Sequence, residues 1–235
     1  MELREMADAP PVVSLGASAS LDPVVESLIA RVRQLFDLDA DTNLIEAHLE
    51  ATESIQVRDD TRGLRVPGAF NGFELAVRAI LGQQVTVKGA STLMSRMVIA
   101  FGDEIRTDHA SLTHLTPEPR RVAAASVAEI RAIGLPAARA ASLLALATAC
   151  ARGELTIEPN GDVPELMRKL RTVPGIGPWT AEYIAMRAMH WSDAFPVGDL
   201  ALRRAAGNVS AAELLRISEQ WRPWRAYAAM HLWAR

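Results

Sequence analysis

Cysteine is almost absent from this sequence, since Cys150 is the single thiol among 235 residues. One thiol can form neither an internal disulfide nor a cluster of cysteines around a metal ion. Its neighbours in the stretch LLALATACA are small and apolar, so we expect a buried side chain with a packing role. Stability must therefore come from the hydrophobic core, for which the length of the chain is ample.

Long apolar runs are also lacking, and none approaches the ~20 residues that a membrane-spanning helix needs. The first residues, MELREMADAPP, lack the basic and then apolar regions of a signal peptide. These absences argue against an integral membrane protein and against a secreted one. We therefore expect a cytoplasmic protein that makes no contact with a membrane.

Lysine is the scarcest charged residue, because only Lys88 and Lys169 among the 25 basic residues are lysines. The net charge of −3 is unevenly spread: residues 1–60 carry −9 and residues 61–235 carry +6. The positive net charge of residues 61–235 is compatible with a polyanionic partner. Abundant arginine and alanine are also typical of a GC-rich genome, and this explanation, which needs no function, has more weight.

Strand patterns are few, and PVVSL at 11–15 is the one candidate. After residue 21 the apolar residues recur at intervals near 3.6, which predicts helices along most of the chain. The first is expected at 21–38, with Asp22 as its N-cap and Pro23 in its first position. The predicted fold class is all-α, built from about ten short helices.

A tight turn interrupts the helical pattern in the stretch TVPGIGPWTAEY, within a pair of short helices predicted at 163–190. Gly175 and Gly177 permit a positive φ or a close approach by another backbone. Ile176, between them, would point inward and hold the turn on the core. The exposed N-terminus of the second helix presents free N–H groups and the positive end of its dipole, which favour an anion.

A lone G-x-G would indicate an ordinary turn, but the longer string L-x-x-[LV]-P-G-I-G-x-x-[ST]-A resembles the helix-hairpin-helix DNA-binding motif. Downstream stands AFPVGDLALRR at 194–204, and this combination is the signature of the HhH-GPD superfamily of DNA glycosylases. The chain is similar to the bacterial 3-methyladenine DNA glycosylase II (AlkA) type, also over residues 67–87, 133–147 and 221–233. The resemblance implies two helical subdomains with a cleft between them.

The AlkA type carries an N-terminal α+β domain, whereas few residues precede the first predicted helix here. We therefore divide the chain into an extended segment at 1–20, a remnant of that domain, and a helical glycosylase domain at 21–235. PVVSL is then what is left of a strand. Such an arrangement is expected of a compact variant or of a fragment of a longer protein.

Asp199 aligns with the catalytic aspartate of the family. It also precedes an amphipathic segment and is expected to be a helix N-cap, which would hold its carboxylate by backbone amides and the helix dipole. A fixed carboxylate stabilises the oxocarbenium-like transition state of base release and activates the attacking water. Asp199 can therefore be both a helix N-cap and the catalytic carboxylate.

The family places aromatic side chains around the flipped base at positions that match Trp179, Tyr183 and Trp233. Trp179 and Tyr183 are spaced i, i+4 and can face one cleft. Core packing is the alternative for each, because large aromatics are common in cores. Leu200 completes the expected pocket, at a position that is often aromatic in the AlkA type. Electron-rich rings attract a cationic alkylated purine more than a normal base.

The resemblance also implies the contacts to DNA. Gly175, Gly177 and Thr180 of the hairpin are expected to hold a phosphate, which carries no sequence information. Gln84 matches the side chain that fills the gap left by the flipped base, where a leucine is more usual. The expected partner is therefore double-stranded DNA with damaged bases, bound by a monomer without sequence preference.

No cofactor is expected to be required. In relatives, main-chain carbonyls that match Arg171, Val173 and Gly175 bind a monovalent cation, so Na⁺ or K⁺ is expected there. Other relatives hold a four-cysteine iron–sulfur cluster, which one cysteine excludes. Relatives that also cut the strand use a lysine at the position of Trp179, so lyase activity is not expected.

The expected function is that of a monofunctional, nucleoid-associated bacterial DNA glycosylase, which excises alkylated bases such as 3-methyladenine and 7-methylguanine. Two alternatives stay open. One is a non-catalytic helix-hairpin-helix protein that binds DNA or senses damage. The other is a glycosylase for deaminated or oxidised bases, which would share the hairpin and the aspartate but differ in its pocket.

Overall fold

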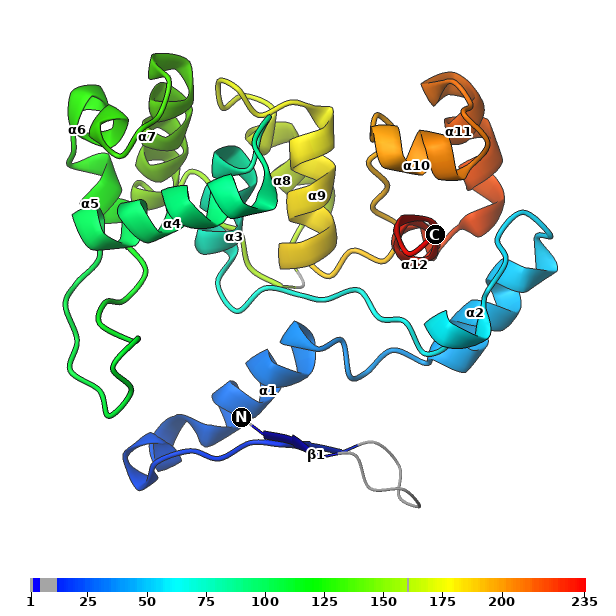
Figure 1. The fold of residues 1–235 in the computed structure, drawn as a ribbon, viewed down its shortest axis with the longest axis horizontal. Helices are drawn as coiled ribbons and strands as arrows, with labels where there is room; N and C mark the ends of the chain where they lie inside the picture. Colours follow the sequence, from blue (N-terminus) through cyan, green and yellow to red (C-terminus); the bar gives the residue numbers. More distant parts are fainter. Residues whose placement is uncertain (1, 5–11, 160) are drawn as a thin grey trace.

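A computed structural model describes residues 2–4, 12–159 and 161–235 (Figure 1). Two short strands, β1 (Glu2–Arg4) and β2 (Val12–Ser14), pair antiparallel with Leu3 opposite Val13. The strand predicted from PVVSL is thus confirmed over Val12–Ser14, and Pro11 lies outside the described residues. Its partner was missed, because a three-residue strand is too short to show an alternating pattern.

The other regular elements of the described chain are helices, apart from one isolated β-bridge between Glu104 and His114, which confirms the all-α prediction apart from the strand pair. Among the described residues, none of the helices combines the length and apolar character that crossing a bilayer requires. The elements in chain order are η1 (Ala19–Val24), α1 (Val25–Leu35), α2 (Thr42–Ala51), η2 (Asp59–Thr61), α3 (Gly72–Leu81), α4 (Val87–Phe101), α5 (Pro119–Ala123), α6 (Val127–Ala132), α7 (Ala137–Ala151), α8 (Val163–Leu170), α9 (Pro178–Ala188), α10 (Leu200–Ala205), α11 (Ala211–Ser218), η3 (Glu219–Trp221) and α12 (Arg225–Trp233).

The first helix differs from its prediction. Asp22 and Pro23 lie inside the 3₁₀ helix η1, whose N-cap residue is Ser18, and α1 begins only at Val25. A 3₁₀ turn is common before an α-helix, and its sequence signals resemble those of the helix itself. The N-cap assignment of Asp22 is therefore wrong.

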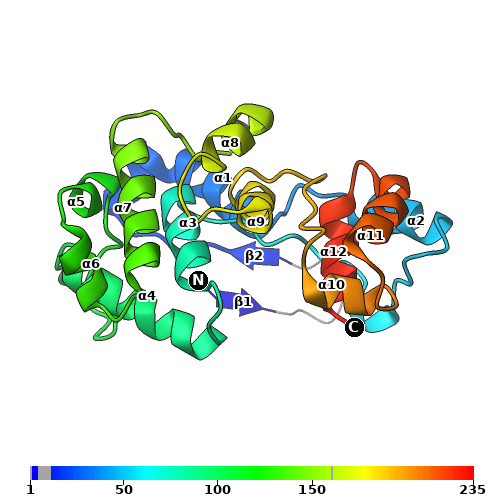
Figure 2. The same cartoon turned by 90° about the horizontal axis from the view of Figure 1, so that it is seen from above.

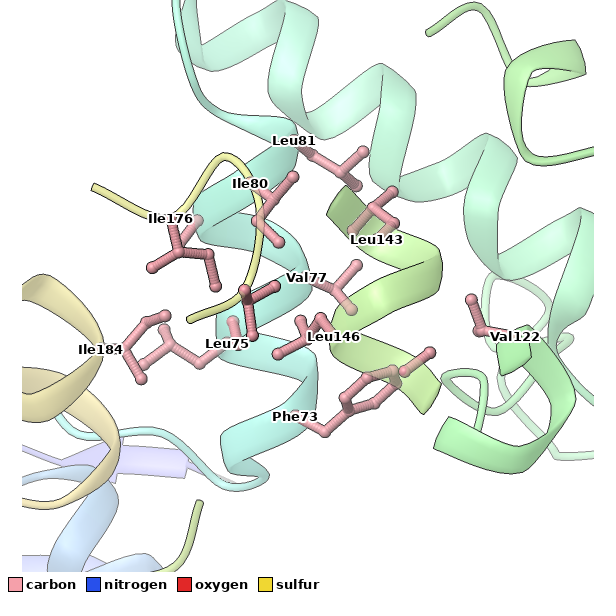
Figure 3. Close-up of a cluster of buried hydrophobic side chains, with 14 of the residues drawn as sticks. Phe73, Leu75, Val77, Ile80, Leu81, Val122, Leu143, Leu146, Ile176 and Ile184 are labelled. Atoms are coloured by element: carbon pink, nitrogen blue, oxygen red, sulfur yellow. The ribbon is translucent and has the colours of Figure 1, made fainter. Parts of the chain in front are cut away.

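One hydrophobic cluster surrounds α3, which is buried along nearly its whole length and packs against α7 and α9 (Figure 3). Ile176 of the hairpin enters this cluster beside Ile80 and is buried, as predicted. Cys150 packs on the same cluster, and burial raises the pKa of its thiol to about 11. Because the thiol stays protonated at neutral pH, this cysteine has a packing role.

A second cluster combines early and late parts of the chain, namely α2 with α10, α11 and α12. Trp221 is its largest fully buried side chain and meets Phe195 edge to face, with ring centroids 5.5 Å apart. Helix α9 lies between the two groups in both views (Figures 1 and 2) and contributes to each, with Ile184 in the first and Met186 in the second. The two helical groups therefore share α9.

Candidate active site

Asp199 is the N-cap of α10, as predicted. Its Oδ1 accepts hydrogen bonds from the backbone N–H groups of Ala201 at 2.8 Å and Leu202 at 3.0 Å. Its own N–H donates to the carbonyl of Pro196, 2.8 Å away, and closes a turn. The carboxylate is thus fixed at the positive end of the helix dipole.

Two tryptophans from different helices also donate to this carboxylate. Trp179 Nε1 on α9 lies 2.8 Å from Oδ2, and Trp233 Nε1 on α12 lies 3.2 Å from Oδ1. Asp199 therefore accepts four hydrogen bonds, and those to a charged oxygen are stronger than neutral ones. The sequence prediction put these indoles around the base and missed their bonds to Asp199, because residues 20 and 34 positions apart share no local pattern.

The spacing of Trp179 and Tyr183 predicted a shared face, and their rings are stacked at 5.3 Å with an angle of 6° between planes. Arg187 extends this face by one helical turn. Its guanidinium lies 5.6 Å from the centroid of the Tyr183 ring, and Nη1 donates to the tyrosine hydroxyl at 3.3 Å. Its Nε donates to the carbonyl of Pro67. Arg187 was missed from the sequence, although the same i, i+4 spacing indicates it.

A cavity of about 440 Å³ opens on this aromatic face, a size within the range of small-molecule sites. Its walls come from the end of α3, the start of α4 and α9, and include Trp179, Tyr183 and Arg187. Trp233 lies instead on the carboxylate of Asp199, and Leu200 is 61% exposed at the first position of α10. Of the four predicted pocket residues, two line this cavity and two lie beside Asp199.

The prediction of a positive φ or a close approach holds for Gly175 of the hairpin and not for Gly177, whose φ is −85°. Gly175 has φ +81°, and a Cβ there would lie 2.2 Å from Ser142 Oγ. Gly177 faces open space, since a Cβ at this position would meet no atom within 4 Å. The first backbone bond of α9 runs from Ala181 N–H to the Gly177 carbonyl at 3.0 Å. The amides before it are free to bind an anion.

Thr180, a residue predicted to help bind a phosphate, lies in the first turn of α9. Its side chain is 4% exposed, and its hydroxyl accepts a hydrogen bond from Gln83 Nε2 at 3.2 Å. The side chain therefore faces the protein, and only its backbone amide lies at the helix N-terminus. Gln84 was predicted to be the wedge, the side chain that fills the gap left by the flipped base. It is exposed between α3 and α4 and has a φ of +56°.

The two glycines give a matched pair of variants. We expect Gly175→Ala to destabilise the protein by about 2 kcal/mol or more, because the new Cβ meets Ser142 and the φ is unfavourable. Gly177→Ala should fold normally, since nothing opposes its Cβ, but should weaken DNA binding about tenfold by obstructing the phosphate. Thermal unfolding and fluorescence anisotropy with a duplex measure the two effects. Equal stability of both variants would contradict the first expectation.

The carbonyls predicted to hold a monovalent cation already have some hydrogen bonds. The Val173 carbonyl accepts from Ile176 N–H at 3.1 Å, and the Gly175 carbonyl accepts from Gln83 Nε2 at 3.0 Å. A carbonyl oxygen has a second lone pair, so the oxygen donors of these two residues and of Arg171 still fit a hard cation. The cation site stays a prediction.

Hydrogen bonds from buried polar groups hold the loop that leads to Asp199 in place. Arg225 on α12 donates from Nε to Asp193 Oδ1 at 2.6 Å and from Nη2 to Oδ2 at 3.0 Å. Phe195 N–H donates to Glu182 on α9 at 3.1 Å, and burial raises the pKa of the Glu182 carboxyl. The loop is therefore attached to the helices that carry both tryptophan donors.

Comparisons with known proteins identify the family of this chain. The family model described as HhH-GPD superfamily base excision DNA repair protein matches residues 77–218, and the AlkA N-terminal domain model matches residues 2–71. DNA-3-methyladenine glycosylase 2 of Escherichia coli is 36% identical over 219 residues, which cover 93% of this chain and 75% of that protein. A probable bifunctional transcriptional activator/DNA repair enzyme AlkA of Mycobacterium tuberculosis is 39% identical over 87% of this chain and 42% of its own length.

Solved structures show the same fold. A 3-methyladenine DNA-glycosylase from Archaeoglobus fulgidus superposes with a TM-score of 0.74 at 22% identity, covering 91% of this chain and 75% of that one. The matched family model spans more than half of the sequence, including the hairpin and Asp199. This chain belongs to the HhH-GPD superfamily of base excision DNA repair proteins.

Proposed function

We propose that the protein is a monofunctional DNA glycosylase that releases alkylated bases, such as 3-methyladenine and 7-methylguanine, by hydrolysing the N-glycosidic bond. The observation that carries the proposal is the Asp199 carboxylate, held by α10 and by two indole N–H groups next to a stacked aromatic wall. The Escherichia coli relative, named DNA-3-methyladenine glycosylase 2, and the Mycobacterium tuberculosis relative, named a probable DNA repair enzyme AlkA, support it.

The damaged nucleotide must leave the duplex to reach this carboxylate, which costs a few kcal/mol. Stacking against Trp179 and Tyr183 offsets the cost, and a positively charged base gains more from electron-rich rings than a neutral one. The guanidinium of Arg187 lies 5.6 Å from the centroid of the Tyr183 ring and lines the same cavity.

In the chemical step the bond between C1′ and the base nitrogen breaks, and its electron pair leaves with the base. An alkylated purine leaves as a neutral molecule and needs no strong acid. Asp199 stabilises the positive charge that develops on the sugar and accepts a proton from the water that adds to C1′. The four donors hold the carboxylate in one orientation throughout.

Hydrolysis alone is expected, without strand cleavage. A Schiff-base step needs an amine beside the sugar, and Trp179 occupies the corresponding position. Lys88 is on α4 and Lys169 is on α8, and Lys169 pairs with Glu165 at 3.4 Å. Helix α9 contains no lysine.

Double-stranded DNA is the proposed partner, and the amides of the hairpin bind it without sequence preference. The protein is proposed to act as a monomer. A phosphate at a helix N-terminus is bound by backbone groups, which do not distinguish bases. Light scattering with and without a duplex would test the stoichiometry, and one protein per lesion is expected.

A base-release profile tests the proposal. Duplex DNA that contains methylated, deaminated and oxidised bases is incubated with the protein, and the released bases are identified by mass spectrometry. We expect methylated purines in excess. Release of only deaminated or oxidised bases would change the substrate class, whereas tight binding without any release would leave a non-catalytic DNA-binding protein.

A further inference from the structure

The α3–α4 connection and the hairpin are joined by a side chain that the catalytic proposal does not use. Gln83 directs its amide nitrogen to the carbonyl of Gly175 at 3.0 Å and to the hydroxyl of Thr180 at 3.2 Å. These partners lie on the hairpin turn and on the first turn of α9, 92 and 97 residues away in sequence. Both amide hydrogens of Gln83 are thereby used.

The neighbour of Gln83 is the exposed Gln84, which follows the end of α3 and has a φ of +56°. A left-handed conformation is costly for a residue other than glycine and persists only where its surroundings hold it. The backbone of Gln83 donates to the Ile80 carbonyl at 3.3 Å, and Thr86 caps α4. The connection is thus short and held at both ends.

Apolar packing fixes how closely α3 and the hairpin approach, through side chains such as Ile80 and Ile176. Such packing is not directional, whereas a hydrogen bond constrains both distance and angle. The two bonds of Gln83 therefore determine how the loop that carries Gln84 is oriented relative to the amides of Gly177 and Thr180.

We propose that Gln83 is a positioning residue, which holds the Gln84 loop at a fixed position relative to the hairpin. The phosphate bound by the hairpin then determines where the Gln84 side chain enters the duplex. The inference rests on the proposed function of the hairpin and of Gln84. Loss of the link leaves the grip and Asp199 in place, but the wedge enters less accurately. Loss of the link therefore slows base flipping, whereas the affinity for DNA and the rate of bond hydrolysis stay unchanged.

Gln83→Leu removes both donors and keeps the size of the side chain. In single-turnover base release, we expect a rate about tenfold lower when the methylated base faces its pairing partner, because a net hydrogen bond of this kind has that effect. When the same base faces an abasic site, little help from the wedge is needed, and the rate should stay within about twofold of wild type. Affinity for an undamaged duplex should be unchanged.

Gln220→Leu is the matched control, since the amide of Gln220 donates to Ser54 at 2.8 Å, away from the hairpin. This variant should release base from both duplexes at the wild-type rate. If Gln83→Leu fails to fold, Gln83→Asn, which is shorter by one methylene, replaces it. An equal loss on both duplexes, or weaker binding to undamaged DNA, would show a merely structural role and overturn the proposal.

A second readout separates this proposal from the function on which it rests. 2-Aminopurine placed beside the methylated base brightens when stacking is lost, and the Asp199→Asn background keeps the base attached. Gln83→Leu should lower this signal at saturating protein. If wild type releases no base, the proposed function fails, yet an unchanged fluorescence would still refute the role of Gln83 and a lowered one would support it.

Discussion

We expect Asp199→Asn to lower the single-turnover rate of base release by about 10³-fold or more, while affinity for the damaged duplex stays within a few-fold of wild type. The amide keeps the shape of the carboxylate and one acceptor oxygen for the N–H groups of Ala201 and Leu202. It carries no charge to oppose the positive sugar. With that oxygen at the Oδ1 position, its NH₂ group would also face the indole N–H of Trp179, which donates to Oδ2.

Asp162→Asn is the matched control for this result. Asp162 caps α8 by accepting from Glu165 N–H at 3.0 Å, the same local role that Asp199 has on α10. Capping alone should matter little for the rate, because asparagine caps helices as well as aspartate does. Should Asp199→Asn retain more than about a tenth of the wild-type rate, the carboxylate would not be the group that stabilises the transition state.

Asp193→Ala is expected to have the largest effect on stability among changes outside the core. Asp193 and Arg225 are 8% and 6% exposed, and Arg222 also donates to Asp193. Removing Asp193 leaves the buried Arg225 guanidinium with only the largely exposed Glu219 carboxylate, 3.5 Å from Nη1, as a counter-charge. This costs about 3 kcal/mol even though the backbone carbonyl of residue 193 still accepts from Arg225. For a chain of this size, Tm should fall by about 6 to 12 °C.

Differential scanning calorimetry measures this change, with Glu213→Ala as the control. Glu213 forms an exposed pair with Arg216 at 2.7 Å, so its loss should shift Tm by about 2 °C or less. Asp193→Ala combined with Arg225→Met should regain part of the lost stability, because the buried guanidinium of Arg225 is removed as well. A drop no larger than that of Glu213→Ala would show that the buried pair is not needed for folding.

Local chemistry explains which features could be predicted. The positive φ of Gly175, the inward Ile176 and the N-cap at Asp199 depend on neighbours within a few residues, and all three were confirmed. The i, i+4 spacing likewise predicted the stacked pair of Trp179 and Tyr183. The wrong cap at Asp22 shows the limit of such reasoning, because a 3₁₀ turn and an α-helix begin with similar signals.

The inward side chain of Thr180 was also beyond prediction. A threonine in the first turn of a helix can point to a ligand or to the protein, and its sequence neighbours do not decide between them. Gln83, which binds Thr180, comes from another helix junction far along the chain. The direction of Thr180 was therefore decided by packing between α3 and α9.

The sequence by itself determined the helical class, the hairpin and the position of Asp199 as a helix N-cap, because these follow from backbone conformation and from residue type. Only the tertiary structure decided what surrounds that acid. The indoles of Trp179 and Trp233 meet Asp199 because the shared helix α9 and the late helix α12 pack on either side of it. Such contacts depend on how helices distant in sequence pack together, and no local spacing encodes that packing.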